Sequence, residues 1–333
     1  MTTPAVRTIR RNFPDAEITL LALPWVADVF GASPRIDRLF LYEKNGRHQG
    51  LRGKLRLAGE LKQQSYDLAI LLQNAFEAAF ITTWARIPAR AGYTTDGRGL
   101  LLTHGVKKDP AIGTKHQVHY YQEMLAGLGL QPGADTLELF LDPDAVQRAG
   151  RLPAISRIDA GTPIIGLNPG AAFGPAKRWP AEKFGKLAQK LHEHTGATIL
   201  VFGTDADREA AAVIQNMGGN NSVHDLTGKT DLALALALID RCNVFVTNDS
   251  GLMHVAAALN TPLAAVFGST DHVATGPYSK RAEVIRKPMD CSPCMKTHCP
   301  QEHFQCMEQI SVKEVADTAL RLLEKYFYSA DRQ

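Results

Sequence analysis

Short apolar runs typical of β-strands alternate with helix-like stretches along nearly the whole chain. Runs such as 66–72 and 197–203 are dominated by aliphatic and aromatic residues, and a stretch with helical spacing of apolar residues follows each of them. This alternation is typical of a parallel α/β sheet, because two parallel strands need a long crossover between them. The strand-like runs are 16–22, 37–42, 66–72, 88–93, 163–170, 197–203, 222–228, 242–249 and 261–268.

The alternation loosens over 141–163, where we place a domain boundary. Two Rossmann-like domains are therefore predicted, spanning 1–150 and 151–311, and 312–333 is predicted to be a C-terminal helix that packs back toward the first domain. A ligand is expected in the cleft between the domains, at the carboxyl ends of the strands. Segment 231–240 alternates like a strand, but an aspartate cap and a high leucine and alanine content favour a helix.

The bulk composition excludes several classes of protein. The chain of 333 residues has a net charge of +3, which is too small to indicate nucleic acid as the main partner. No apolar run approaches the ~20 residues that a membrane-spanning helix needs, and the first residues lack the apolar core of a signal peptide. A cytosolic protein that can touch a membrane surface is therefore expected.

The segment VTNDSGLMHVAAALNTP (246–262) passes from a β-branched run directly into a helix-forming run. Ser250 is a suitable N-cap, and Gly251 permits close approach of a ligand to the backbone. The N–H groups at such a helix start favour an anion such as a phosphate. Asp249 could accept hydrogen bonds from sugar hydroxyls, and His254 could donate to the same phosphate. The alternative is an ordinary capped helix with His254 in the core.

A second segment, GLNPGAAFGPAKRWPAEKF (166–184), also runs from a strand into a helix, through three glycines and three prolines. It brings Lys177 and Arg178 to the same sheet edge, where Lys177 could neutralise charge that develops on a phosphate leaving group. The alternative is a solvated pair of cations. Neither segment is a Walker loop or a G-x-G-x-x-G motif, so ATPase and NAD-binding functions are disfavoured.

Three segments resemble those of the ADP-heptose:lipopolysaccharide heptosyltransferase family. They are PGAAFGPAKRWP, VTNDSGLMHVAAALNTP and VFGSTD. Within that family, the heptosyltransferase II group is the most similar. NFPDAEITLLALPW, LLQNAF and IPARAGY fit as well, so the resemblance covers nearly the whole chain. It implies a GT-B fold and an inverting transfer of L-glycero-D-manno-heptose from ADP-heptose to the inner-core heptose of lipopolysaccharide, an acidic glycolipid. It also implies work in the cytoplasm at the inner membrane face, without a required metal.

The resemblance also implies roles for single residues. Lys177 would stabilise the diphosphate as it leaves, and Asp249 would bind the heptose. Backbone N–H groups at the helix start would hold the diphosphate. The implied donor-binding residues are Lys177, Glu209, Thr227, Asp249, Ser250, Gly251, Leu252 and His254, of which Glu209 and Thr227 would face the nucleoside.

One departure from the family concerns the start of the chain. The family begins with a strand and a glycine–aspartate loop before the helix that contains Pro4 here. The first strand and the family's general-base aspartate are absent from this sequence, so we assign no catalytic base and expect a start site placed too far downstream or a truncated chain. The alternatives are heptosyltransferase I or a later heptosyltransferase, another nucleotide-sugar enzyme of GT-B architecture such as a UDP-sugar epimerase, or a nucleotide-sugar-binding pseudoenzyme.

Four of the five cysteines lie within sixteen residues: Cys291, Cys294, Cys299 and Cys306. A C-x₂-C pair followed by two more cysteines could ligate zinc or an iron–sulfur cluster. The alternative is a set of reduced or partly disulfide-linked thiols that fixes the chain before the last helix, since the spacing fits no standard zinc module. The D-x-D sequence at 205–207 could also suggest a metal, but acidic capping of a helix is favoured there.

Basic residues are concentrated in 44–56, which holds five Lys or Arg and no acid. Such a run could contact the acidic acceptor or anionic lipid head groups, although a solvated loop explains it too. Trp25, Asn74 and Tyr93 fall at predicted strand ends, and core packing is the alternative for the two aromatic residues. The candidate acceptor-binding residues are Arg47, Arg52, Lys54 and Asn74.

Overall fold

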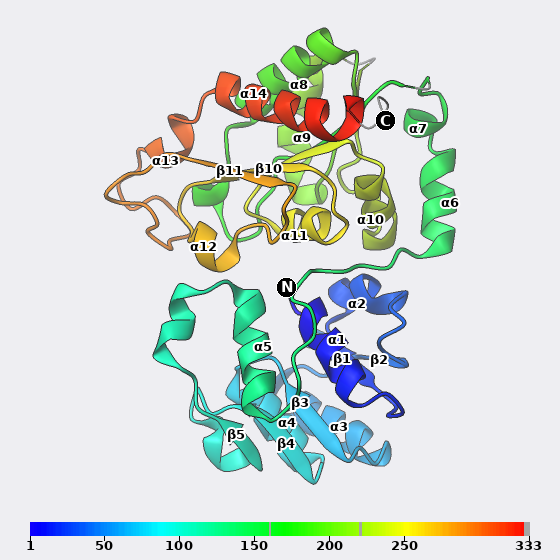
Figure 1. Cartoon of the computed structure of the whole chain (residues 1–333), viewed down its shortest axis with the longest axis vertical. Helices are drawn as coiled ribbons and strands as arrows, with labels where there is room; N and C mark the ends of the chain where they lie inside the picture. The colour runs from blue at the N-terminus through cyan, green and yellow to red at the C-terminus, as the bar shows by residue number, and fades with distance from the viewer. Residues whose placement is uncertain (160, 220–221, 330–333) are drawn as a thin grey trace. The chain divides into compact units, whose positions relative to one another are not determined.

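A computed structural model describes residues 1–159, 161–219 and 222–329, and the chain divides into two compact units, Met1–Thr136 and Leu137–Gln333 (Figure 1). The division falls before the predicted boundary at residue 150. The reason is helix α6 (Pro143–Arg151), which packs against α10 (Leu232–Asp240) of the second unit. Arg148 of α6 also forms an ion pair of 2.8 Å with Asp231, the N-cap of α10.

The first unit contains parallel strands in two separate sheets. Strands β1 (Thr19–Ala22) and β2 (Arg38–Leu41) pair with each other, and β4 (Ala89–Tyr93) lies between β3 (Leu68–Leu71) and β5 (His104–Val106). The short β5 was not predicted from the sequence. The helices of this unit are α1 (Thr3–Asn12), α2 (Pro24–Gly31), α3 (Gly50–Gln63), α4 (Phe76–Trp84), η1 (Arg98–Leu101), η2 (Pro110–Thr114) and α5 (Gln117–Gly127).

Buried Arg98 organises the loop after β3. Its side chain is fully buried and donates hydrogen bonds to the carbonyl oxygen of Tyr93 at 2.7 Å and to Asn74 Oδ1 at 3.0 Å. Tyr93 itself is buried against Met124 and Leu125, so the core-packing alternative holds for it. Trp25, for which core packing was also the alternative, is instead 72% exposed.

The second unit is built on one parallel sheet of six strands. Their order is β11-β10-β9-β6-β7-β8, so the chain builds outward from β6 in one direction and then returns to add β9 on its other side. Ligands of open α/β sheets bind at such a reversal of strand order, outside the carboxyl ends of the strands. The strands are β6 (Ile164–Asn168), β7 (Thr198–Val201), β8 (Val223–Asp225), β9 (Val244–Asn248), β10 (Leu263–Phe267) and β11 (Ala282–Arg286).

Every residue of β6, β9 and β10 is buried, which is the pattern expected when helices cover both faces of a parallel sheet. The predicted helix at 231–240 is confirmed as α10, and Asp231 accepts a hydrogen bond from the N–H of Leu234. The remaining helices of this unit are α7 (Pro153–Ser156), η3 (Pro175–Lys177), α8 (Ala181–Thr195), η4 (Asp205–Asp207), α9 (Arg208–Gly218), α11 (Gly251–Ala258), α12 (His272–Thr275), α13 (Gln305–Glu308), α14 (Val312–Leu323) and η5 (Glu324–Tyr328).

The C-terminal helix α14 belongs to the second unit. It packs against α8, beside which it lies in Figure 1, and against β9, β10 and β11. Its apolar face, including Val315, Ala319 and Leu322, is part of the core under the sheet. Packing of 312–333 back toward the first domain stays a prediction.

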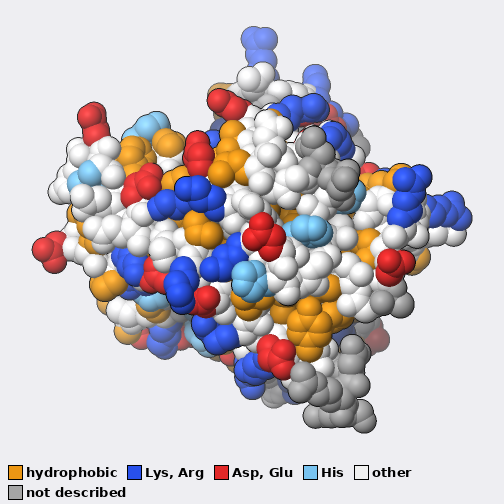
Figure 2. All heavy atoms as spheres, turned by 90° about the horizontal axis from the view of Figure 1, so that it is seen from above, with side chains coloured by type: hydrophobic (Ala, Val, Ile, Leu, Met, Phe, Trp, Pro, Cys, Tyr) orange, Lys and Arg blue, Asp and Glu red, His pale blue; other side chains and the backbone are white. Residues whose placement is uncertain are grey.

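The surface carries mixed charge, in keeping with the small net charge. In Figure 2 basic and acidic side chains are interspersed over the face seen from above. Within the described parts of the chain, no helix combines the length and the apolar character needed to cross a bilayer.

Candidate functional site

Two buried asparagines join the loops at the point where the strand order reverses. Asn168 ends β6 and Asn248 ends its parallel neighbour β9, so both lie at the same edge of the sheet. Asn168 Nδ2 donates to Ser250 Oγ at 2.7 Å, and Asn248 Nδ2 donates to the carbonyl oxygen of Pro169 at 2.7 Å. The N–H of Trp179 donates to Asn248 Oδ1 at 3.0 Å. These bonds connect the glycine-rich segment 169–177 to the start of α11, as a preorganised site requires.

An ion pair between the two predicted segments forms the centre of the site. Lys177 Nζ lies 2.5 Å from Asp249 Oδ2, and their side chains are only 13% and 6% exposed. Thr270, in the loop after β10, donates from Oγ1 to the same carboxylate oxygen at 2.6 Å. The ammonium of Lys177 has three donors, so the bond to Asp249 leaves capacity for ligand oxygens. Lys177 and Asp249 were predicted to act at this edge, whereas their pairing and the contribution of Thr270 were not.

The start of α11 has the geometry of an anion site. Ser250 has an extended backbone, and its Oγ accepts a hydrogen bond from the N–H of Met253 at 3.3 Å, which confirms the predicted N-cap. No atom lies within 4 Å of where a Cβ on Gly251 would stand, and Gly251 is exposed, so a ligand can approach the backbone there. Positive helix-dipole charge and N–H donors at this position favour a phosphate. His254 lies in the first turn of the same helix.

The two candidate nucleoside contacts differ in accessibility. Thr227 is fully buried, and its hydroxyl donates to Asp225 Oδ1 at 2.6 Å, so a contact of its side chain with the nucleoside stays a prediction. Glu209 lies in the first turn of α9 and is exposed. The D-x-D sequence nearby forms a capping box, in which Asp207 accepts from the backbone and hydroxyl of Thr204. The capping interpretation of this sequence is therefore confirmed.

Carboxylates offset much of the predicted basic run in the first unit. Arg47 pairs with Glu43 at 3.2 Å and Lys54 pairs with Glu77 at 2.6 Å, whereas Arg52 is exposed. The relation between Glu43 and Arg47 could have been read from the sequence, since residues four apart often pair. The local charge around 44–56 is consequently weaker than the sequence alone predicts.

Asn74 is held by the protein itself. Its Oδ1 accepts from Arg98 at 3.0 Å, and its Nδ2 donates to the hydroxyl of Tyr120. Both ends of the amide therefore have protein partners, and a direct contact of Asn74 with an acceptor stays a prediction.

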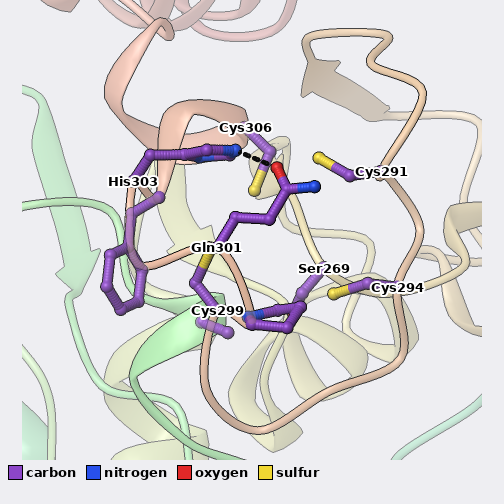
Figure 3. A pocket seen from close by; sticks show the side chains of 10 residues that line it. Ser269, Cys291, Cys294, Cys299, Gln301, His303 and Cys306 are labelled. Atoms are coloured by element: carbon purple, nitrogen blue, oxygen red, sulfur yellow. Dashed lines mark hydrogen bonds between the residues drawn. The ribbon is translucent and has the colours of Figure 1, made fainter.

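The four clustered cysteines gather around one pocket (Figure 3). Cys291, Cys294, Cys299 and Cys306 all line it and are all free thiols. In the described part of the chain, no three His, Cys, Asp or Glu side chains are already arranged to hold a metal ion. The structure thus brings the predicted ligands together without completing a metal-ligand geometry.

Comparison with known proteins decides the family. The model of glycosyltransferase family 9 (heptosyltransferase) matches residues 54–305. The chain belongs to glycosyltransferase family 9. It is therefore a glycosyltransferase, and its two α/β units with parallel sheets are those of a GT-B fold.

Three relatives illustrate how far the similarity extends. The family 9 chain is 30% identical over 332 residues to lipopolysaccharide heptosyltransferase 2 of Salmonella typhimurium, covering 96% of this chain and 93% of the relative. The structure of E. coli ADP-heptose lps heptosyltransferase II is 28% identical with a TM-score of 0.78, over 97% of this chain and 94% of that one. A glycosyl transferase family 9 structure from Veillonella parvula is 26% identical with a TM-score of 0.87, over 97% and 93%.

A cap substitution tests whether the start of α11 binds the diphosphate in this family 9 enzyme. We expect Ser250→Ala to lower the free energy of unfolding by about 0.5–2 kcal/mol. We also expect it to weaken ADP binding about fivefold, the equivalent of ~1 kcal/mol, because the N–H groups of the first turn lose their alignment. Calorimetric titration with ADP measures the second effect.

The matched control is Asp231→Ala, which removes the side-chain cap of α10 in the same unit. This variant should lose similar stability and keep its affinity for ADP. Equal ADP affinities for Ser250→Ala and the unmodified protein would contradict the assignment of the α11 start to the diphosphate.

Proposed function

We propose that this family 9 enzyme transfers L-glycero-D-manno-heptose from ADP-heptose to the inner-core heptose of lipopolysaccharide, with inversion at the anomeric carbon. The observation that carries the proposal is the Lys177–Asp249 pair beside the open start of α11. A cation and a set of N–H donors suit a diphosphate, and a carboxylate next to them suits sugar hydroxyls. The names of the relatives from Salmonella typhimurium and E. coli support the donor and acceptor.

The proposed chemistry is a single displacement. A hydroxyl oxygen of the acceptor heptose forms a bond to the anomeric carbon, the bond from that carbon to the β-phosphate oxygen breaks, and the acceptor hydroxyl loses its proton. ADP leaves with additional negative charge. Lys177 and the N–H groups at the start of α11 stabilise that charge through electrostatics that are already in place before the reaction. No metal is required in this scheme, and no residue of this chain is assigned as the general base.

Asp249 is proposed to orient the donor sugar. An ionised carboxylate offers about four lone-pair sites. The hydrogen bonds from Lys177 and Thr270 therefore leave sites on Asp249 that can accept hydrogen bonds from sugar hydroxyls. Ser250, Gly251 and Leu252 are proposed to bind the diphosphate through their backbone, with His254 beside it. Exposed Glu209 is proposed to face the nucleoside.

The acceptor is proposed to meet the first unit. Arg52 is exposed on α3, and Arg47 and Lys54 lie nearby in the sequence with carboxylate partners that an acidic glycolipid could replace. A lipid-linked acceptor places the enzyme at a membrane surface, and we propose the cytoplasmic face of the inner membrane as its place of work.

Calorimetric titration with ADP-heptose, with UDP-GlcNAc as the control, tests the proposed donor. We expect ADP-heptose to bind at least about tenfold more tightly, a difference of ~1.4 kcal/mol. A folded sample that binds neither compound, or binds UDP-GlcNAc equally well, would contradict the proposal.

A transfer assay tests the acceptor. Inner-core acceptors with and without the first heptose are compared as substrates. Transfer to the acceptor that already carries one heptose is expected, and preference for the heptose-free acceptor would instead indicate heptosyltransferase I activity.

A further inference from the structure

The cysteine loop (residues 291–306) is hydrogen-bonded to the loop after β10. The N–H of Met295 donates to the carbonyl oxygen of Ser269 at 2.8 Å, and Ser292 Oγ donates to the carbonyl oxygen of Gly268 at 2.7 Å. Gly268 also approaches the cysteines directly, since a Cβ there would lie 3.0 Å from Cys306 Sγ. Thr270 follows Ser269 in the same loop and donates a hydrogen bond to Asp249 in the donor site.

The cysteine loop also contacts the glycine-rich segment that carries Lys177. The N–H of Ala176 donates to the carbonyl oxygen of Thr297 at 3.1 Å. Gly174 packs so closely on Thr297 that a Cβ would lie 2.5 Å from that oxygen, and its φ of +147° favours glycine. The cysteine loop therefore touches the segment that carries Lys177 and the loop after β10, whose Thr270 donates to Asp249.

A buried hydroxyl in the pocket lacks a partner. Ser269 is 1% exposed, lines the pocket with the four thiols, and its Oγ makes no hydrogen bond with another group of the structure. Buried hydroxyls nearly always have a partner, because an unsatisfied one costs free energy. An orphaned hydroxyl that faces a group of thiols indicates a bound species that Ser269 could hydrogen-bond, such as a metal-bound thiolate.

We propose that Cys291, Cys294, Cys299 and Cys306 bind one thiophilic divalent ion, zinc being the best match, and that this ion fastens the cysteine loop to the two loops of the donor site. Four thiolates in a closed site are typical of structural zinc. Each thiol that coordinates releases its proton to solvent. The thiols must draw closer together on binding, and the side chain of Gln301, which Figure 3 draws among them and which bonds to His303 at 2.5 Å, must withdraw.

Cobalt titration of the reduced, metal-free protein tests the site without any turnover. Co²⁺ is the probe, because its thiolate complexes have charge-transfer absorption, and Zn²⁺ is then added to displace it. We expect saturation at one equivalent, full displacement by Zn²⁺, and a matching mass increase by native mass spectrometry. Ser269→Ala should weaken Zn²⁺ binding about tenfold, because loss of a group that hydrogen-bonds a metal-coordinating side chain typically lowers metal affinity by that amount.

Cysteine variants complete the test. Cys294→Ser and Cys299→Ser, both in the accessible loop, should lose the charge-transfer band, whereas Cys242→Ala should keep it because Cys242 is buried apart from the pocket. Circular dichroism confirms that each variant is folded. Absence of the band in the unmodified protein, or its persistence in a folded Cys294→Ser/Cys299→Ser double variant, would overturn the proposed site.

The proposed effect of the metal ion on the donor-site loops rests on the proposed function, and it is measured separately as a change in ADP affinity. We expect Zn²⁺ to tighten ADP binding about tenfold in the unmodified protein and to leave it unchanged in Cys299→Ser, since ordering the loops in advance removes a cost of binding. If the protein binds cobalt but not ADP, the result contradicts the proposed donor site and still supports the proposed metal site. ADP binding that is the same with and without Zn²⁺ would overturn the link.

Discussion

Replacing Lys177 with methionine is expected to lower kcat/KM for heptosyl transfer by about 10²–10³-fold. The ammonium is the cation that the structure brings to the start of α11, and it is held in place by Asp249 at 2.5 Å. Methionine keeps the length and apolar stem of the side chain but removes the charge that we propose stabilises the departing diphosphate. Initial rates with ADP-heptose and the heptosylated acceptor measure the effect.

Two controls separate chemistry from stability. Lys186→Met removes an exposed lysine of α8 and should leave the rate unchanged within about twofold, as surface substitutions away from a site do. Titration with ADP gives a readout that does not depend on turnover, and a loss of about tenfold or more is expected for Lys177→Met, since hydrogen bonds to charged groups contribute ~1.5–3 kcal/mol. A folded Lys177→Met enzyme with an unchanged rate and unchanged ADP affinity would remove Lys177 from the mechanism.

Replacing Trp179 with alanine is expected to lower the free energy of unfolding of the second unit by about 3–5 kcal/mol. The indole is 1% exposed and packs edge-on against Phe184, with 5.0 Å between ring centroids. Its Nε1 donates to the carbonyl oxygen of Ile310 at 3.0 Å. Alanine would leave a cavity in the core and remove one of the two donors to that carbonyl, the other being Lys183 Nζ at 3.3 Å. Urea denaturation followed by circular dichroism measures the loss.

The contribution of the indole N–H can be separated from that of ring volume. Trp179→Phe keeps most of the buried surface and should cost about 1–3 kcal/mol, because the carbonyl of Ile310 loses the nearer of its two donors. Trp84→Ala serves as the matched control: its side chain is 58% exposed, and the change should stay within ~0.5 kcal/mol. A loss below ~1 kcal/mol for Trp179→Ala would show that the site's supporting core does not depend on this residue.

Most of the second unit was predictable because its signals are local, although β11 (Ala282–Arg286) was not among the predicted strands. The strand β9 and the cap at Ser250 follow one another in the sequence, and strand-to-helix turns of parallel strands meet at one edge of the sheet. Lys177 and Asp249 could therefore be assigned to the same edge. Their direct contact could not, because it joins residues 72 positions apart and depends on β9 returning to lie beside β6. Thr270 was missed for the same reason, since only the sheet order brings the loop after β10 to Asp249.

Predictions for the first unit depended on side-chain partners that a pattern of charges does not reveal. Lys54 was assigned to the acceptor from its place in a basic run, yet its partner Glu77 comes from another helix. Asn74 was singled out as a polar residue after a strand, but the residues that hold it, Arg98 and Tyr120, come from η1 and α5.

The hydrogen bond from Trp179 to Ile310 has a thermodynamic consequence for the end of the chain. It joins the residue two positions after Lys177 to the residue two positions before α14. Local opening that detaches α14 together with Ile310 must break this bond and release one support of the segment that carries Lys177. Since coupling between two equilibria is reciprocal, a ligand that orders the donor loop must also favour the docked state of α14. We therefore expect ligand binding at the donor loop to stabilise the docking of α14.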